Sequence, residues 1–174
     1  MSVSMHRLTL PLFTRGLNVL ASYLDAAEAF AAQNKVDPQT LVDARLAPNM
    51  LSLSGQVQRA SDTSKNAIGR LTSVAAPRFE DVETTLPQLK ERIAKTIAFF
   101  ESVPASALDG AEHKPVSLKF GKVQADFTGD EYLLTFVLPN FYFHVATAHG
   151  ILRQQGVPIG KADYLGPFSG TTAV

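Results

Sequence analysis

Apolar residues recur at steps of three and four along most of this chain, and that spacing is typical of packed amphipathic helices. Four segments show it. The first covers about residues 2–33 and the second about residues 49–71. The third begins with a capping box at 85–88 and stops before Pro104, and the fourth begins with a capping box at 128–131. The spacing therefore predicts four helices.

Between the third and fourth segments the apolar residues change to a period of two, over residues 116–120 and 123–127. Gly121 and Lys122 separate the two runs, with glycine first, as a type II′ hairpin turn prefers. An isolated two-stranded ribbon is marginally stable, so this one must lie on the helices. We therefore predict an all-α fold, a four-helix bundle with a short β-hairpin inserted before the last helix.

Prolines and glycines modify this plan. Pro11 predicts a kink or a restart in the first helix, and Pro139 predicts a bend in the last one, which Gly156 ends. The connection between the second and third helices is long enough for a crossover. We predict an irregular C-terminal arm over about residues 157–174 and a single helical-bundle domain over residues 1–174.

Composition excludes several classes of function. The 174 residues hold 16 Lys+Arg and 16 Asp+Glu, and this balance disfavours a dedicated nucleic-acid partner. The absence of cysteine excludes disulfides, thiolate metal sites and cysteine nucleophiles. No apolar run approaches the about 20 residues of a membrane span, so no membrane partner is expected. His6, Arg7 and Arg15 interrupt the first apolar stretch, which is unlike a signal peptide, and we expect a cytoplasmic protein.

One histidine is best placed for chemistry, His144 on the last predicted helix. His6 lies at the start of the chain and His113 in the loop before the hairpin, where solvated side chains are the rule. His149 follows His144 by five residues, so the two side chains diverge by about 140° and do not easily share one ion. His144 is therefore a lone candidate.

Several polar residues are predicted to surround His144. Asn140 lies one turn earlier on the same helical face, and Tyr142 is predicted near the rim. Gln56 and Asp62 lie on the second helix, whose apolar face is unusually small and polar. A lone imidazole among aromatic and carboxamide groups is also typical of a hydrogen-bonded core residue, and Asp62 also fits an exposed helix flank. Both interpretations stay open at this point.

Four stretches of the chain resemble an uncharacterised family, the domain-of-unknown-function family 1993. They cover residues 56–62, 139–145, 151–157 and 160–166, and the Phe-Tyr-Phe-His element within the second is the most specific. That family is similar to the DinB/YfiT-like superfamily, so the resemblance implies a four-helix bundle.

The superfamily resemblance also implies a metal site of three histidines, one on the second helix and an H-x-x-x-H pair on the last. Some members are metal-dependent thiol transferases or isomerases. His144 matches the last of the three histidines, Asn140 takes the place of its pair, and Gln56 or Gln58 occupies the second-helix position. Amide carbonyls are poor partners for zinc or nickel beside imidazole, so the site implied here is degenerate, with His144 as the only candidate metal ligand.

Three hypotheses follow. In the first, a small organic molecule binds between the helices, contacted by His144, Asn140, Gln56, Asp62 and Tyr142. In the second, a metal-dependent enzyme, thiol transferase-like or hydrolase-like, uses His144 with Asn140 and Asp62 around a divalent metal.

In the third hypothesis the protein is structural or binds a partner through its outer helix faces. The first helix is rich in alanine, and Gly16 on it offers a surface for close approach. We therefore expect a homodimer.

Overall fold

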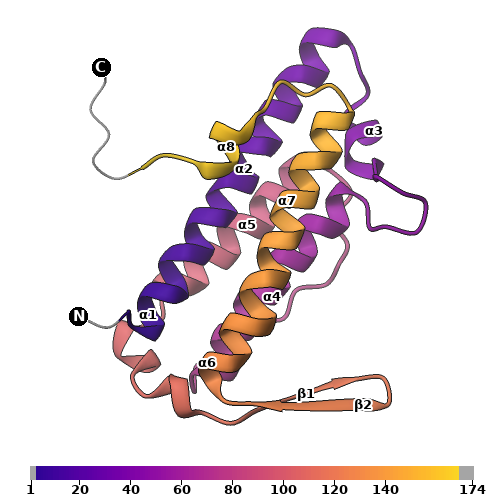
Figure 1. Ribbon diagram of the computed structural model, residues 1–174. Helices are drawn as coiled ribbons and strands as arrows, with labels where there is room; N and C mark the ends of the chain where they lie inside the picture. The colour runs from indigo at the N-terminus through magenta and orange to yellow at the C-terminus, as the bar shows by residue number, and fades with distance from the viewer. Residues whose placement is uncertain (1–2, 169–174) are drawn as a thin grey trace.

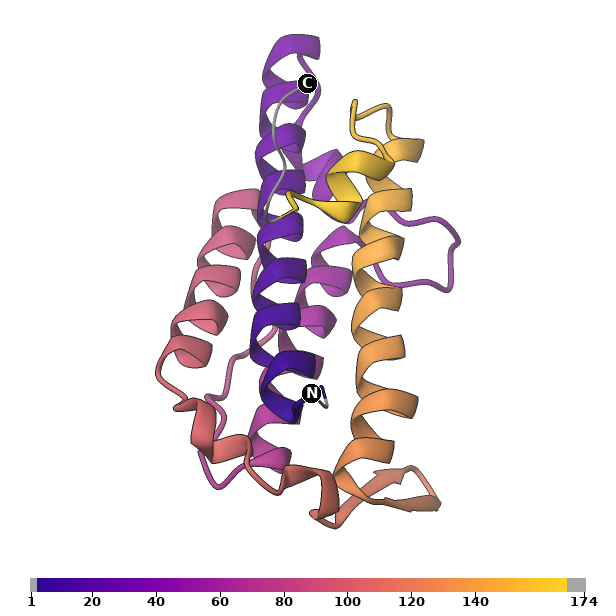
Figure 2. The ribbon, with the colours of Figure 1, turned by 60° about the vertical axis from the view of Figure 1, so that its left-hand side comes forward.

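The computed structural model describes residues 3–168 of the chain. Four helices dominate it: α2 (Leu10–Asn34), α4 (Leu53–Leu71), α5 (Leu86–Glu101) and α7 (Leu138–Gln154). They lie side by side, with α4 between α5 and α7 and with α2 against the same two helices (Figures 1 and 2). The predicted four-helix bundle is confirmed.

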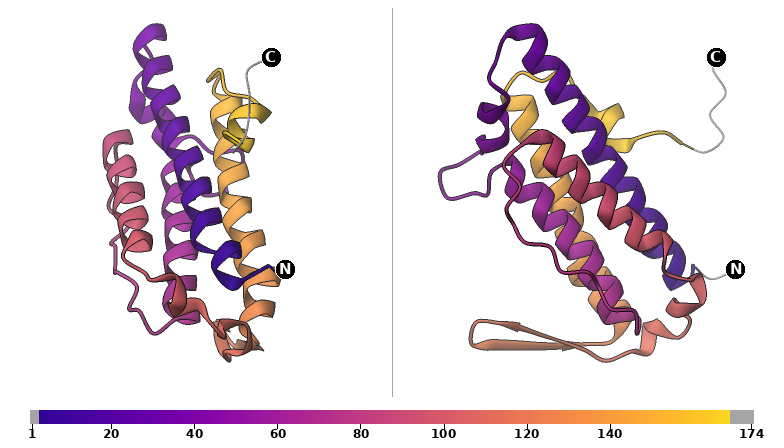
Figure 3. Two further views of the ribbon diagram at one scale, coloured as in Figure 1. Left: turned by 90° about the vertical axis from the view of Figure 1, so that its left-hand side faces the viewer. Right: turned by 180° about the vertical axis from the view of Figure 1, so that it is seen from behind.

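The connection between α4 and α5 is a crossover. The two helices run in the same direction, opposite to α2 and α7, so the segment 72–85 passes back along the bundle (Figure 3). Accordingly Lys90, early in α5, lies 3.0 Å from Asp25 and 2.6 Å from Glu28, both late in α2. Three short elements lie in the other connections: α3 (Pro38–Asp43), η1 (Ala105–Leu108) and η2 (Ala111–His113).

Side-chain caps and one proline mark where α2, α4 and α5 start. After α1 (Met5–Leu8) the chain restarts as α2 with Pro11 in its first turn, one of the two outcomes predicted for that proline. The predicted capping box at 85–88 starts α5. The predicted start at residue 49 was wrong, because the Ser52 side chain accepts the backbone N–H of Gly55 and so begins α4 at Leu53.

The predicted hairpin is present as β1 (Val116–Phe120) and β2 (Val123–Phe127), paired antiparallel in a continuous register. Gly121 has a φ of +59°, and a type II′ turn requires a positive φ at its first central position. Val116 and Leu118 are buried, so one face of β1 packs on the protein. The hairpin lies across one end of the bundle (Figure 1).

The last predicted helix is continuous but has three parts: α6 (Gly129–Glu131), a π-helical stretch η3 (Tyr132–Val137), and α7. Pro139 lies in the first turn of α7. Since proline has no backbone N–H, the regular helical hydrogen-bond ladder is interrupted at residue 139, and the wider π-turns lie immediately before it. The bend predicted for Pro139 stays a prediction, and the irregularity observed beside this proline is the π-helical stretch.

Gly16 lies inside the bundle, where α2 meets α7. A Cβ atom at this position would stand 2.5 Å from Cε1 of Phe141, far closer than two carbon atoms normally approach. Phe13 packs on the same ring, edge to face, with centroids 5.2 Å apart. Gly16 therefore permits a close approach within one chain, and the prediction that it offers an outer surface to a second copy was wrong.

Part of the predicted irregular arm is helical, as α8 (Lys161–Leu165), which packs against α2 (Figure 2). Arg15 donates hydrogen bonds to the backbone carbonyl oxygens of Leu165 and Pro167, and so attaches the arm to α2. The rest of that prediction, residues 169–174, lies outside the described residues. No helix in the described part of the chain is both long and apolar enough to cross a membrane.

Candidate functional site

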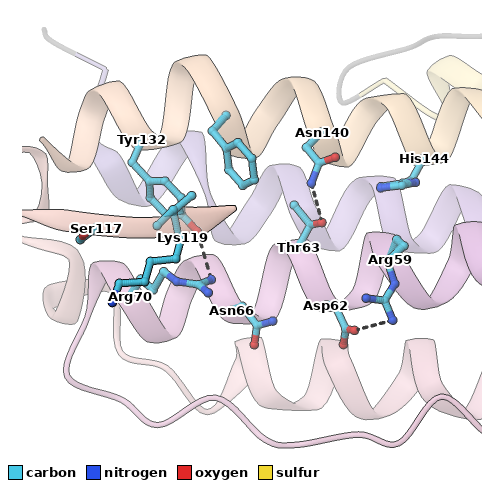
Figure 4. A pocket seen from close by; sticks show the side chains of 12 residues that line it. Arg59, Asp62, Thr63, Asn66, Arg70, Ser117, Lys119, Tyr132, Asn140 and His144 are labelled. Carbon is cyan, nitrogen blue, oxygen red and sulfur yellow. Dashed lines mark hydrogen bonds and ion pairs between the residues drawn. The ribbon is translucent and has the colours of Figure 1, made fainter. Parts of the chain in front are cut away.

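A cavity of about 310 Å³ opens between α4, α7 and β1 (Figure 4). One wall is a polar stripe of α4, formed by Arg59, Asp62, Thr63, Asn66 and Arg70. These residues are three or four positions apart, or adjacent, and so share one helical face. This face explains why the second helix carries so many polar residues.

The facing wall comes from η3 and α7. Tyr132, Phe136, Asn140 and His144 line it at intervals of four residues. Figure 4 shows Tyr132 at one end of the cavity, Asn140 in the middle and His144 at the other end. β1 closes the end near Tyr132.

The ring of His144 is held in one tautomer. Its Nδ1 lies 2.8 Å from Oε1 of Gln56, and the Gln56 Nε2 donates to the backbone carbonyl oxygen of Leu51 at 3.1 Å. That second bond orients the amide, so Oε1 is the atom facing the ring. An amide oxygen can only accept, so Nδ1 carries the proton and Nε2 carries the lone pair.

The Nε2 lone pair of His144 is available to the cavity. The side chain is only 8% exposed, and burial, followed by the positive charge of Arg59, lowers its pKa to about 4. Within residues 3–168, the Nε of Arg92 is the only fully buried side-chain nitrogen or oxygen without a partner. The Nε2 of His144 also makes no hydrogen bond there, so it must reach the open space that His144 lines.

The middle of the cavity is bridged by one hydrogen bond. Asn140 donates from Nδ2 to Oγ1 of Thr63 at 3.1 Å, which joins α7 to α4 (Figure 4). The Thr63 hydroxyl proton and the Asn140 Oδ1 have no other hydrogen bond among the described residues. The pair therefore offers a neutral donor and a neutral acceptor to the cavity.

The carboxylate of Asp62 is already neutralised. Arg92 contacts it at 2.8 Å, Lys65 at 3.0 Å and Arg59 at 3.3 Å. Arg92, with a side chain only 1% exposed, also binds Glu83 at 3.0 Å and Asp81 at 3.1 Å. Burial by itself would raise the pKa of Glu83, but hydrogen bonds from Gln58 and the backbone, followed by those and the charge of Arg92, hold it below its usual value. Asp62 therefore fixes the α4 wall to α5 and to the crossover segment.

The end of the cavity away from His144 is cationic. Arg70 donates from Nη1 to the hydroxyl oxygen of Tyr132 at 3.3 Å (Figure 4). Lys119 and Ser117, which alternate with buried residues on β1, line the same end. Burial raises the pKa of Tyr132, so its hydroxyl keeps its proton near neutral pH.

The structure brings together most of the predicted site residues. His144, Asn140 and Asp62 line the cavity, and Gln56 lies behind His144 as its hydrogen-bond partner.

Tyr142 does not line this cavity. Its ring packs on Phe141 with centroids 5.3 Å apart, and burial, followed by nearby Tyr164, raises its pKa.

The sequence interpretation missed the cationic end, Arg70, Lys119 and Tyr132. A signal for part of it exists, since Arg70 continues the polar stripe of α4 and Tyr132 continues the four-residue interval that leads to His144. No comparable signal exists for Lys119, because its place depends on how the hairpin docks.

The residues at the predicted metal positions do not fit zinc or nickel. Both amide atoms of Gln56 are engaged, Asn140 presents a neutral amide, and three cations hold Asp62. Across residues 3–168, no group of three or more His, Cys, Asp or Glu is placed to hold a metal ion. One imidazole with amides is a poor donor set for these metals, so the metal-dependent hypothesis rests on His144 alone.

Comparison with known proteins agrees with this architecture. The structure is similar to that of a DinB family member protein from Shewanella denitrificans, with a TM-score of 0.88 and 38% sequence identity over 97% of this chain and 96% of that one. The chain is therefore a DinB-like helical bundle. Residues 5–165 match the family described as Domain of unknown function (DUF1993), and the chain belongs to that family. No curated protein matches it.

Proposed function

We propose that this protein binds a small organic molecule in the cavity between α4, α7 and β1, and that Nε2 of His144 accepts a hydrogen bond from it. The observation that carries this proposal is the fixed tautomer of His144, which leaves an acceptor at the cavity. The volume of about 310 Å³ falls at the lower end of the range of about 300–1,000 Å³ for small-ligand sites.

Two features of His144 favour its interpretation as a ligand-binding residue over that of an ordinary core histidine. A buried histidine in a closed core has partners for its polar atoms, because an unmet buried polar group is costly. In His144 one nitrogen is satisfied and the other is left at an open polar space. With a pKa of about 4 the ring is neutral near pH 7. Its Nε2 can therefore accept a hydrogen bond from a ligand group that carries a proton, such as a hydroxyl or an amide N–H.

The remaining predicted residues take distinct roles in this proposal. Gln56 is a positioning residue that fixes the His144 ring. Asn140, with Thr63, contacts the middle of the ligand, and Asp62 holds the α4 wall in place. Tyr142 does not line this cavity, so the proposal assigns it no contact with the ligand.

A screen tests the proposal directly. The wild-type protein is incubated with a library of small polar metabolites and examined by native mass spectrometry and ligand-observed NMR. His144→Ala should weaken any true ligand about tenfold, the value of one good hydrogen bond. His113→Ala, which removes an exposed histidine away from the cavity, is the matched control. Absence of any ligand, or equal binding by His144→Ala, would contradict the proposal.

Two further expectations, a homodimer and a cytoplasmic location, stay predictions. The homodimer has lost the support of Gly16, which packs inside the bundle. Light scattering at micromolar concentration tests it, and a mass of one chain would contradict it.

A further inference from the structure

The charges around the cavity are unevenly distributed. Its lining holds three cations, Arg59, Arg70 and Lys119, and one carboxylate, Asp62. Arg59 pairs with Asp62 at the His144 end (Figure 4) and also with Asp81. The ion-pair cluster there balances three cations, Arg59, Lys65 and Arg92, against three carboxylates, Asp62, Asp81 and Glu83. The excess positive charge is therefore at the other end, where Arg70 and Lys119 approach from α4 and β1. Since the whole chain has zero formal net charge, this excess is a local feature.

Neither cation at that end pairs with an acidic side chain in the described part of the protein. The hydrogen bond from Arg70 goes to the neutral hydroxyl of Tyr132, and Lys119 has no ion pair there. The nearest carboxylate by strand register is Asp126, directly opposite Ser117 on the hairpin. Asp126 does not line the cavity, and it accepts hydrogen bonds from the side chains of Gln124 and Ser117.

The same end is rich in hydrogen-bond donors. Arg70 uses one of its five N–H groups on Tyr132, which leaves the others free, and Lys119 has three. The Tyr132 oxygen accepts from Arg70, so its own O–H points elsewhere and can donate. Two cations and a hydroxyl donor around one space are suited to anionic oxygens, which form the strongest hydrogen bonds with such groups.

The opposite end of the cavity, at His144, offers a ligand a hydrogen-bond acceptor. There the Nε2 of His144 accepts, and Asp62 is occupied by its own cations. A molecule spanning the cavity thus meets donors and positive charge at one end and a neutral acceptor at the other (Figure 4).

We infer that the ligand is a small organic anion, whose carboxylate or phosphate group lies between Arg70 and Lys119 and whose far end gives a hydroxyl or N–H proton to Nε2 of His144. This inference rests on the proposed function, because it names the ligand class of the same cavity. Carboxylate and phosphate share the anionic oxygens that these side chains recognise.

A series of defined probes tests both ends of the ligand at once. The probes are ω-hydroxycarboxylates of increasing chain length, compared with ω-hydroxyalkyl phosphates, uncharged ω-hydroxyamides and alkanoates without the hydroxyl. Affinities are measured by calorimetry and NMR at constant ionic strength. The acid should bind at least about tenfold more tightly than its amide, and the hydroxyl should add about fivefold. The ratio of phosphate to carboxylate affinity identifies the preferred anion, and the best chain length reports the spacing of the two ends.

Variants assign each preference to its residues. In the double variant Arg70→Gln/Lys119→Gln the acid should bind no better than the amide. The control Arg7→Gln/Lys122→Gln removes the same charge from exposed positions outside the cavity and should keep the preference. His144→Ala should abolish only the contribution of the hydroxyl.

Two results would overturn the inference. One is equal binding of acid and amide by the wild-type protein, and the other is an acid preference that survives in Arg70→Gln/Lys119→Gln. If the amide still binds in a His144-dependent way, the proposed function stands and only the anionic class is wrong. If no probe binds at millimolar concentration, the anionic class is rejected, and the neutral compounds of the metabolite screen decide the proposed function separately.

Discussion

His144 and His149 lie on the same helix, and the two sides of α7 treat them differently. Each has Nδ1 in a hydrogen bond, His144 with Oε1 of Gln56 at 2.8 Å and His149 with the hydroxyl of Tyr23 at 2.9 Å. Burial lowers the pKa of both. An amide oxygen can only accept, whereas a phenol can donate or accept, so only His144 has its tautomer fixed by its partner.

The surroundings differ as well. The ring of His149 packs between Tyr23 and Tyr164, with centroids 5.4 and 6.2 Å away, under the arm that contains α8. His144 instead faces a cavity whose walls are ionic and amide side chains. The comparison teaches that residue type and helix position alone do not distinguish the proposed ligand-binding histidine from a packed one. The chemistry of the Nδ1 partner and the polarity of the opposite wall do.

The largest expected effect concerns the ion pairs behind the cavity wall. Arg92→Leu removes a buried guanidinium that binds both Asp62 and Glu83, and it should lower the free energy of unfolding by about 3–5 kcal/mol. Urea unfolding measures this. The variant should also weaken binding in the cavity while leaving the hydrogen bond between Tyr23 and His149 intact.

Lys90→Leu is the control for Arg92→Leu. Lys90 pairs with Asp25 and Glu28 at the surface, and its loss should cost about 1 kcal/mol or less. An equally small cost for Arg92→Leu would mean that the buried pairs do not support the cavity wall.

The second prediction concerns pH. Because the folded protein holds the pKa of His144 at about 4, below its ordinary value of 6.5, the unfolded chain binds more protons between these two pH values. Stability should therefore fall as pH decreases from about 6.5 to about 4, by up to about 3 kcal/mol from this residue. Comparing wild type with His144→Gln at each pH isolates it. A constant difference between the two proteins would refute the lowered pKa.

The third prediction tests the partner that fixes the ring. Gln56→Leu leaves the buried Nδ1–H of His144 without an acceptor and should cost about 1–3 kcal/mol. The double variant Gln56→Leu/His144→Phe removes both polar groups, so it should recover part of that loss in a double-mutant cycle. Strict additivity of the two substitutions would show that the bond contributes nothing.

The smallest effect is expected on the other side of α7. Tyr23→Phe removes the hydroxyl that contacts His149 but keeps the ring packing, so it should cost about 1 kcal/mol. Thermal and urea unfolding measure it. The ligand affinity of the cavity should not change, and a reduced affinity would mean that the two sides of α7 are coupled.

Much of the fold was predictable because it depends on local patterns. The apolar spacing, the capping box at 85–88 and the glycine at the hairpin turn each act within a few residues, and the structure has them as expected. The late start of α4 shows the limit of this reasoning, since a serine cap determined it and the apolar pattern did not.

The candidate site was only partly predictable. Asn140 and His144 share a face because they are four residues apart, whereas Tyr142 stands two residues from each and so turns away, which the spacing itself implies. The state of Asp62 was not predictable, because Arg92 lies 30 positions further along the chain. The contribution of Lys119 likewise depends on the docking of the hairpin, which no local pattern determines.

The most direct test of the central claim is a long-range proton–nitrogen NMR spectrum of the histidine rings, recorded at pH 7 and again at pH 5. His144 should show a protonated Nδ1 and an unprotonated Nε2 at both pH values, and a bound ω-hydroxycarboxylate should shift the Nε2 resonance. His149 serves as the reference within the same helix and should not respond to that ligand. A proton on Nε2 of His144 at pH 7 would contradict the account.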